Sequence, residues 1–539
     1  MKSGRVFLRL ASRKRVLSLS KKSSALTSSE FVTEPNLSPY NFQQKRFLAT
    51  PASKENPTTV KLSTFNHPVV LGKSNVMSSV FGETPICTTP LHKKILTKIL
   101  DHAAAFPSRP ALIMAEKPSE RVTYVELHRQ TYGLSSFLAL RGFEHMDVCC
   151  TVLPNCLESV PAYLAAMMIG GVSMAADQDC TAEQLVNAFN SSQCKAVITN
   201  STLLPNVLAA SECCPSIKVI VCVTSSASET LPEGVVRWTE AIESPTVICD
   251  NHIYDFNDPA FIQHHSGLPE EQNGIVMSHK SISTMLDINT EYFNKYVYKR
   301  MFYDNKEGRF EPRDEYAILS MPFHHIFGFA QLSRALIEGS SGLIMTNLDP
   351  ASYLQTIQDY KPKIMAILPE FAEFLLHDQM TDEYDLNSLE VVLIGGAPFD
   401  RKFLDEFLAK FRHVRFMVPF YGWPECGVGF MSPMKRRQGA ATILPSFQQK
   451  IVSPETGDTL PFNARGEICL RSPTLMNGYM NNPEATAKAI DADGWFHTGD
   501  IGMLERNGET LILDRTKFPS SQEEEFTEIL TARQGGRLG

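Results

Sequence analysis

The most distinctive string in the chain is Asp493-Gly494-Trp495-Phe496-His497-Thr498-Gly499-Asp500. We predict a tight turn here, because Gly494 and Gly499 permit backbone geometry that most side chains forbid. A carboxylate held at the end of such a turn, Asp500, can accept hydrogen bonds from vicinal hydroxyl groups, as a ribose offers. An ordinary turn with a solvated aspartate would explain a shorter string, but this one is longer and more particular.

Two further strings follow predicted strands. Gly395-Gly396-Ala397-Pro398 follows the apolar run 389–394, and Phe420-Tyr421-Gly422-Trp423-Pro424-Glu425 follows the run 414–419. Small residues at the carboxyl end of a strand are typical of a ligand crevice in an open α/β sheet. A plain strand–turn–helix junction is the structural alternative for each string taken alone.

Taken together, these strings closely resemble the nucleotide-binding core of the adenylate-forming enzymes, which include acyl- and aryl-CoA synthetases, 4-coumarate-CoA ligases and luciferases. The resemblance covers about residues 85 to 517. It implies that a small-molecule carboxylic acid reacts with ATP to give an acyl-adenylate and pyrophosphate, and that CoA then gives a thioester. The expected cofactors are therefore ATP, Mg²⁺ and CoA.

The resemblance also assigns roles to single residues. It places Gly395 to Pro398 and Tyr421 against adenine, and Asp500 and Arg515 on the ribose hydroxyls. Glu425 would coordinate the Mg²⁺ that bridges phosphate oxygens, and Lys517 occupies the hinge position. The catalytic residues expected in this way are Glu425 and His324, and the expected nucleotide-binding residues are Ser266, Gly267, Gly395, Gly396, Ala397, Pro398, Tyr421, Gly422, Asp500 and Arg515.

The expected phosphate loop departs from the family pattern. In the family this loop is rich in Ser, Thr and Gly and carries a Lys, so that backbone N–H groups and one positive charge meet the ATP phosphates. Ser266 and Gly267 match that pattern. The Thr-like positions, the second Gly and the Lys are replaced by Leu268, Pro269, Glu270 and Asn273. Pro269 lacks an N–H donor, and Glu270 repels phosphate, so the loop argues against efficient ATP binding.

Two other features weaken the expected chemistry. The family pattern Tyr-Gly-x-Thr-Glu has Pro424 in place of its Thr, which removes a hydroxyl at the reacting centre. The family continues beyond Arg515 as a mobile lid that supplies a Lys, and we expect that lid to be absent from this chain. Two hypotheses follow: an acid–CoA ligase with weak or no turnover, or a catalytically inactive protein that binds a nucleotide, an acyl ligand or a protein partner.

The pair His324-His325 follows the predicted strand 317–323. By resemblance this element lines the acyl pocket, and its His side chain gates access to the adenylate. A histidine that caps the end of the strand is a comparable structural alternative. A metal site is a weaker alternative, because no Cys or carboxylate lies at ligand spacing.

Strands that alternate with helices predict parallel sheets covered on both faces. We expect an α/β fold with two doubly wound parallel-sheet subdomains and a small β-barrel-like subdomain, which is the large N-terminal domain of the family. The C-terminal lid domain is expected to be absent. The expected divisions are a basic segment over 1–60, α/β subdomains over 85–250 and 251–420, a β-rich subdomain over 421–515 and a hinge remnant with tail over 516–539.

Composition narrows the class of protein further. The net charge of −8 gives no reason to expect nucleic acid, and the scattered cysteines form no C-x-x-C, which favours reduced thiols. The apolar run Val160 to Ala176 is interrupted by Pro161 and is better explained by a buried helix and strand than by a membrane span. Residues 1–29 are basic and without acid, typical of a mitochondrial transit peptide. A disordered basic tail on a cytoplasmic protein is the alternative.

Overall fold

The computed structural model describes residues 58–61, 68–71, 75–245, 255–264, 274–303, 311–346, 349–395, 401–431 and 440–514. The chain divides into a unit Met1–Asn56 and a unit Pro57–Gly539, and every described residue belongs to the second. Several predictions lie outside the described residues. They are the basic N-terminal segment, the phosphate loop with Ser266 and Gly267, the residues Gly396, Ala397, Pro398 and Arg515, and the hinge and tail from Lys517 onward.

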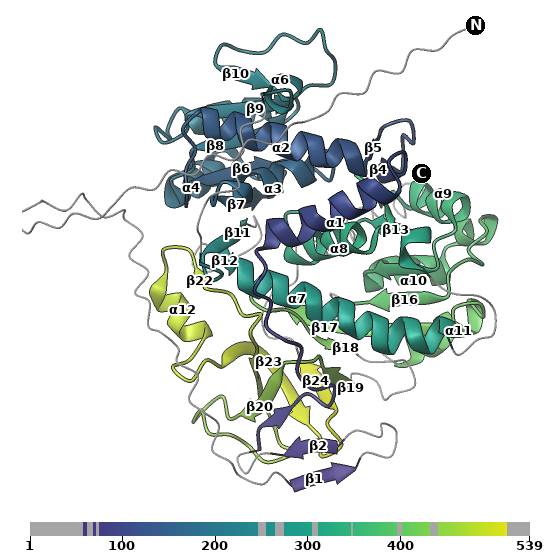
Figure 1. The fold of residues 1–539 in the computed structure, drawn as a ribbon. Helices are drawn as coiled ribbons and strands as arrows, with labels where there is room; N and C mark the ends of the chain where they lie inside the picture. The colour runs from purple at the N-terminus through teal and green to yellow at the C-terminus, as the bar shows by residue number, and fades with distance from the viewer. Residues whose placement is uncertain are drawn as a thin grey trace, which may run out of the picture. The chain divides into compact units, whose positions relative to one another are not determined.

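An eight-stranded sheet forms the first layer of the fold (Figure 1). Six neighbouring strands are parallel, and the last two are antiparallel. In spatial order the strands are β10 (Val235–Arg237), β9 (Val219–Val223), β8 (Ala196–Asn200), β6 (Val148–Val152), β7 (Val172–Ala176), β11 (Pro259–His264), β12 (Ile275–Ser278) and β22 (Gly478–Tyr479).

Helices cover both faces of this sheet. Successive side chains of a strand point to opposite faces, and both faces need cover because the side chains on both are buried. Cys149 of β6 packs with α2 (Tyr124–Leu140), α3 (Ser159–Met168) and α6 (Trp238–Ile242). The next residue, Cys150, packs with α4 (Ala182–Ser192) and α5 (Leu204–Ser211) on the other face. The doubly wound arrangement predicted for this part of the chain is therefore confirmed.

Helix starts carry local signals that the sequence makes visible. Thr123 and Glu126 form a capping box at the start of α2, and Thr181 and Gln184 do the same for α4. Ser278 caps α7 (His279–Tyr292), which continues as a π-helix over Phe293–Tyr303. These caps satisfy backbone N–H groups that have no partner inside the helix.

A four-stranded sheet joins segments that are far apart in the chain. Its order is β13 (Tyr316–Leu319), β14 (Ser341–Ile344), β4 (Pro110–Met114) and β5 (Arg121–Thr123), with β14 parallel to β4. Helices α1 (Leu91–Ala105) and α8 (Ile326–Glu338) share one hydrophobic cluster with it. Strands from either side of position 250 thus pair directly, so the sheets cross the division that we expected there.

The third sheet changes character along its length. The parallel end consists of β15 (Ile364–Ile367), β16 (Val391–Ile394) and the first half of β17 (Phe416–Trp423). It packs with α9 (Pro350–Tyr360), α10 (Pro369–His377) and α11 (Arg401–Lys410). The order then continues through antiparallel strands. They are β17 (Phe416–Trp423), β18 (Gly427–Met431), β19 (Ala440–Ile443), β24 (Thr510–Asp514), β23 (Phe496–Leu504), β21 (Arg465–Arg471), β20 (Gln448–Val452), β3 (Met77–Ser78), β2 (Pro68–Leu71) and β1 (Thr58–Lys61).

Strand β17 links the two parts of this sheet. Its first half, Phe416 to Pro419, pairs with β16, and its second half, Phe420 to Trp423, pairs with β18. The predicted β-rich subdomain is therefore continuous with a parallel sheet through β17. The remaining elements are α12 (Pro483–Ala489) and the 3₁₀ turns Pro312–Asp314 and Gln379–Glu383.

The predicted turn over 493–500 is only partly correct. Gly494 lies in a turn with a φ of +79°, but the residues from Phe496 onward form the nine-residue strand β23. Asp500 is consequently a buried residue within a strand. The apolar run Val160 to Ala176 forms α3 and β7 as predicted, and no helix in the described ranges is both long and apolar enough to cross a bilayer.

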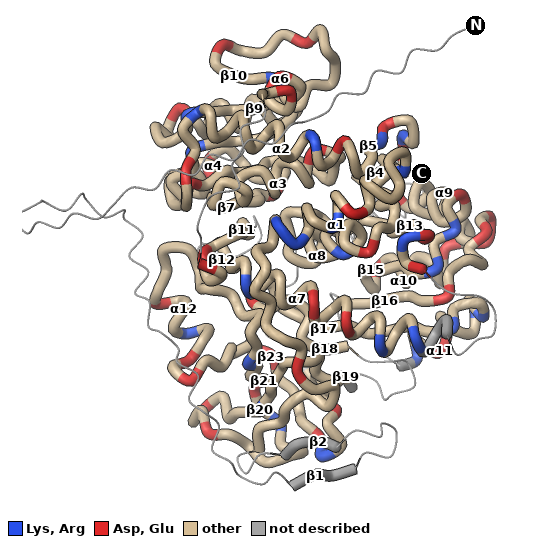
Figure 2. The backbone as a smooth tube through the Cα atoms, in the orientation of Figure 1, with Lys and Arg blue, Asp and Glu red and all other residues tan. Residues whose placement is uncertain are grey.

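Surface charge and cysteines fit the predicted composition class. Figure 2 shows Lys and Arg interspersed with Asp and Glu along the described chain. The cysteines within the described ranges are free thiols, and most of them are buried. Neither feature points to a nucleic-acid surface or to a disulfide framework among these residues.

Candidate functional site

Asp500, the carboxylate expected to meet the ribose, faces strand β17. The Tyr421 hydroxyl donates a hydrogen bond to Asp500 Oδ2, and the Trp423 indole Nε1–H donates a second one to the same oxygen at 2.9 Å. Only 1% of Asp500 is exposed. The structure therefore places Tyr421, expected on adenine, and Asp500, expected on the ribose, in direct contact through their side chains.

Aromatic rings close the space around this carboxylate. Trp423 packs edge-on against Tyr421, with ring centroids 4.5 Å apart, and against Phe430 and Phe496 at 6.1 Å each. Trp423 is itself buried. A ribose hydroxyl that used Asp500 Oδ2 would have to compete with the Tyr421 and Trp423 donors, so this oxygen is already satisfied by the chain's own side chains.

Glu425, the expected Mg²⁺ ligand, follows β17 and is half-buried. Its Oε1 accepts a hydrogen bond from the Tyr479 hydroxyl at 2.7 Å, and its backbone carbonyl accepts one from Met476 N–H. Burial, followed by the neighbouring Glu425 charge, raises the pKa of Tyr479, so Tyr479 remains a donor. A carboxylate oriented in this way fits an oxygen ligand for Mg²⁺.

Two glycines predicted to bind nucleotide have a packing role in the structure. A Cβ on Gly395 would lie 2.5 Å from the Phe420 carbonyl oxygen. A Cβ on Gly422 would lie 2.3 Å from the Gly427 carbonyl oxygen. Both positions need glycine, because β17 passes too close to Gly395, and β18 too close to Gly422, for any side chain.

The predicted histidine pair separates into two different environments. The His325 side chain accepts a hydrogen bond from Phe327 N–H and caps the start of helix α8, whereas the structural alternative was a cap on the end of the preceding strand. His324 is 9% exposed and faces Asp177, with Nε2 lying 3.8 Å from Asp177 Oδ2. His324 is therefore buried beside a carboxylate at the carboxyl end of β7.

The loop that carries His324 is fixed from the carboxyl ends of the parallel strands. Asn155, which follows β6, accepts a hydrogen bond from Phe323 N–H and donates one to the Met321 carbonyl. Gln263 of β11 accepts a hydrogen bond from Ile326 N–H at 3.1 Å. With Asp177 directly after β7, these side chains converge on the edge of the sheet at which open α/β folds bind ligands.

Sequence reasoning missed Asn155, Asp177, Gln263 and Trp423. A signal existed for Asn155 and Asp177, because each is a polar residue just after a buried parallel strand. No comparable signal existed for Trp423, whose position the family pattern leaves open. Its contact with Asp500 joins residues 77 positions apart.

Comparison with known proteins identifies the class to which this site and fold belong. The family model described as "AMP-binding enzyme" matches residues 99–480. The chain is 30% identical over 449 residues to 4-coumarate--CoA ligase 1 of Arabidopsis thaliana, covering 81% of this chain and 77% of that protein. The chain belongs to the AMP-binding enzyme family, and within it resembles the acyl- and aryl-CoA ligases.

Solved structures agree on the fold. A luciferase-like enzyme from the Zophobas morio mealworm superposes with a TM-score of 0.69 at 18% identity, covering 83% of this chain and 100% of that chain. The N-terminal domain of FACL13 from Mycobacterium tuberculosis gives a TM-score of 0.63 at 20% identity, covering 78% of this chain and 99% of that domain. The described fold is that of the large N-terminal domain of adenylate-forming enzymes, as predicted.

Proposed function

We propose that this chain is an acid–thiol ligase by descent, of the acyl- or aryl-CoA synthetase type, whose adenylation is weak or absent. The observation that carries the proposal is the hydrogen bond from Trp423 Nε1–H to Asp500. It places a buried donor on the carboxylate that a ribose would use. The nucleotide half of the site is thus closed by the chain's own side chain.

Energetics support low nucleotide affinity. A hydrogen bond to a charged group contributes about 1.5–3 kcal/mol, and a ribose that displaces Trp423 must first replace this bond. The corresponding loss of affinity is roughly 10- to 100-fold. Pro424 and the departures at Pro269, Glu270 and Asn273 act in the same direction, because they remove donors and positive charge from the expected phosphate position.

The expected cofactors fit the described residues to different extents. If Mg²⁺ binds, Glu425 is the residue that would hold it, and the ion would neutralise charge on phosphate oxygens. Tyr479 would keep the Glu425 carboxylate oriented, as it does now. At Asp500 a nucleotide would compete with Trp423 and Tyr421, which both donate to Oδ2.

An inactive binding protein is the second candidate function. It is favoured because Trp423 bonds the Asp500 carboxylate, whereas hydrogen bonds to Asn155 and Gln263 hold the loop that carries His324 in place. Such a protein would retain an acyl ligand, or a protein partner, without forming an adenylate. Its ligand would contact the loop over 320–325 at the carboxyl edge of the eight-stranded sheet.

Carboxylate-dependent exchange of pyrophosphate into ATP distinguishes the two functions. The purified full chain is incubated with Mg²⁺, ATP and a panel of fatty and aromatic acids, and Glu425→Gln serves as a control that keeps size but removes charge. A slow exchange that depends on one class of acid and disappears in Glu425→Gln supports the weak ligase. No exchange from folded protein supports the binding protein, and fast exchange contradicts a closed site.

A further inference from the structure

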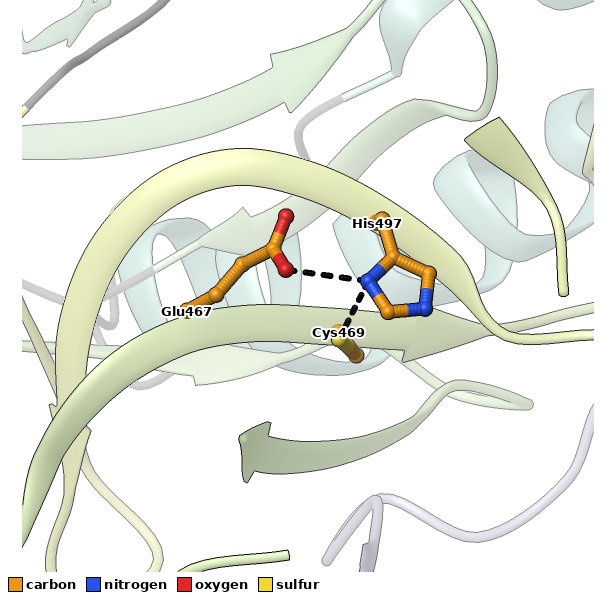
Figure 3. A group of neighbouring side chains, drawn as sticks. All are labelled: Glu467, Cys469 and His497. Atoms are coloured by element: carbon orange, nitrogen blue, oxygen red, sulfur yellow. Dashed lines mark hydrogen bonds and ion pairs between the residues drawn. The ribbon is translucent and has the colours of Figure 1, made fainter. Parts of the chain in front are cut away.

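Strands β21 and β23 bring three potential metal ligands together on the outer side of the third sheet. Cys469 and His497 are direct partners across the two strands, and Glu467 lies two residues before Cys469 (Figure 3). Residues two apart in a strand share a face. Glu467, Cys469 and His497 therefore point into the same space, as the sticks in Figure 3 show.

The distances between the three polar atoms are short. Glu467 Oε2 lies 2.9 Å from His497 Nδ1, and Cys469 Sγ lies 3.6 Å from the same nitrogen. All three ligand atoms lie within 4.8 Å of one another, and this is the one group of three or more such side chains found within the described ranges. A single ion placed between them would contact one sulfur, one nitrogen and one oxygen.

Neighbouring groups orient these side chains as outer partners orient metal ligands. Gly499 N–H donates a hydrogen bond to Glu467 Oε1 at 2.8 Å, which leaves Oε2 directed at His497. On the far side of the imidazole, Nε2 lies 3.6 Å from Asp491 Oδ2. A carboxylate beside the second nitrogen of a histidine fixes the ring and its tautomer when the first nitrogen binds a metal.

The cluster is buried on the side of Cys469 and partly exposed on the side of His497 and Glu467. Cys469 is fully buried and packs with Val452 and Trp495. The side chains of His497 and Glu467 are 27% and 17% exposed, so an ion and one water molecule can enter from their side. Three protein ligands with one open position are typical of four-coordinate zinc.

The chemistry of the ligands selects the metal. A thiolate and an imidazole favour zinc over Mg²⁺ or Ca²⁺, which take oxygen ligands. One thiolate and one carboxylate carry two negative charges, which match one Zn²⁺. Burial and the adjacent Glu467 charge raise the pKa of the free Cys469 thiol, so the bound cation itself must supply the positive charge that stabilises the thiolate. Lys450 Nζ lies 3.9 Å from Asp491 Oδ2.

We propose that Glu467, Cys469 and His497 bind one zinc ion, with water as the fourth ligand and Asp491 holding the histidine. Binding breaks the S–H bond of Cys469, forms a Zn–S bond and releases one proton to solvent. The proposed site is distinct from the expected nucleotide site, because burial alternates along β23 and leaves His497 partly exposed while Asp500 is buried. The proposal does not depend on the proposed function.

Cobalt substitution in the full chain tests this site directly. The chain is treated with a chelator, its fold is checked by circular dichroism, and Co²⁺ is added. We expect a sulfur-to-cobalt charge-transfer band that saturates at one equivalent and is displaced by Zn²⁺. A folded wild-type chain without this band overturns the proposal, whatever the behaviour of the variants.

Variants assign the band to its ligands. Cys469→Ser should abolish the charge-transfer band, whereas Cys213→Ser, which removes an exposed thiol, should leave it unchanged. Asp491→Asn should weaken zinc binding by roughly 10- to 100-fold in calorimetric titration, because it loosens the histidine without removing a ligand. A band that survives Cys469→Ser and disappears in Cys213→Ser would show adventitious binding at the exposed thiol and overturn the site.

Discussion

Two regions of the expected active site are built in different ways. At the carboxyl edge of the eight-stranded sheet, Asn155 and Gln263 bond the backbone of the loop that carries His324, so its shape is fixed by main-chain contacts. Between β17 and β23, side chains bond each other, and Trp423 and Tyr421 occupy Asp500. The first region fixes a loop through its main chain, whereas the second satisfies a carboxylate oxygen through side chains.

This difference indicates which half of the ancestral chemistry the chain retains. Backbone anchoring keeps a pocket wall in place whether or not a ligand is bound. A carboxylate oxygen that already accepts two hydrogen bonds from its own chain, as Asp500 Oδ2 does, binds a ribose hydroxyl only in competition with those donors. We therefore expect the loop that carries His324 to keep its shape with different acyl ligands. Binding of a nucleotide at Asp500 should instead require the Trp423 side chain to rearrange.

The largest effect is expected for Gly422→Ala. Its Cβ would meet the backbone of Gly427 and Val428 at 2.3 and 2.7 Å, and neither group can rotate away. We expect a loss of about 3 kcal/mol in the free energy of unfolding, measured in urea. Gly429→Ala is the matched control on the neighbouring strand, because its Cβ would meet side chains and no backbone: Leu470 at 3.1 Å, and Phe447 and Trp423 at 3.5 Å. Equal losses for both variants would contradict the packing role of Gly422.

A smaller loss is expected for Asn155→Ala. This change removes both hydrogen bonds that hold the loop at Met321 and Phe323, so we expect a loss of about 2 kcal/mol and faster amide exchange over 320–325. Asn387→Ala, whose side chain bonds only the exposed Asp385 turn, should change stability by less than about 0.5 kcal/mol. Unchanged exchange in the loop would show that Asn155 does not anchor it.

The free energy of unfolding should depend on pH, because two buried histidines have different pKa values in the folded and unfolded chain. Burial lowers the pKa of His279 from 6.5 to about 4 and that of His92 to about 3. The unfolded chain then binds more protons than the folded chain below pH 6.5, so stability is present above that pH and is lost as the pH falls towards 4 and then 3. The slope should approach about 1 kcal/mol per pH unit for each histidine.

Urea unfolding between pH 7.5 and 5 measures this slope. His279→Gln should flatten it, whereas His377→Gln should not, because the His377 side chain is 62% exposed. An identical slope in wild type and His279→Gln would show that other groups cause the loss. Above pH 7, both histidines are neutral in either state, and nucleotide binding can be compared without this contribution.

The smallest effect is expected for the double variant Asn273→Lys with Pro424→Thr. It returns the family's charge and hydroxyl to the sequence but leaves Trp423 on Asp500. Pyrophosphate exchange should therefore stay at the level of the wild-type chain. Thioester formation by this double variant alone would contradict the view that Trp423 limits the nucleotide side.

The sequence predicted most elements of the fold because their signals are local. Apolar runs such as 389–394 became strands, and local capping boxes at Thr123 and Thr181 start two of the helices. Which strands become neighbours depends on contacts between distant segments. The pairing of β14 with β4, across more than two hundred residues, and the continuity of the third sheet through β17 have no local signal.

The candidate site was predicted in part for the same reason. Tyr421, Glu425, His324 and Asp500 were found from their strings, and the structure places Tyr421 on Asp500. The turn predicted before Asp500 became strand β23 because β21 and β24 pair with it on either side. Asp500 contacts Trp423 and His324 faces Asp177 because of the way the strands meet in space. Residue types alone do not reveal that arrangement.

Equilibrium binding of AMP tests the central claim most directly, because AMP carries the ribose with the fewest phosphates. Wild type, Trp423→Phe and Trp238→Phe are compared by calorimetry at pH 7.5; both tryptophans are 5% exposed, but only Trp423 bonds Asp500. We expect Trp423→Phe to bind AMP at least about tenfold more tightly than the other two chains. Equal affinity of all three chains would contradict a nucleotide site closed by Trp423.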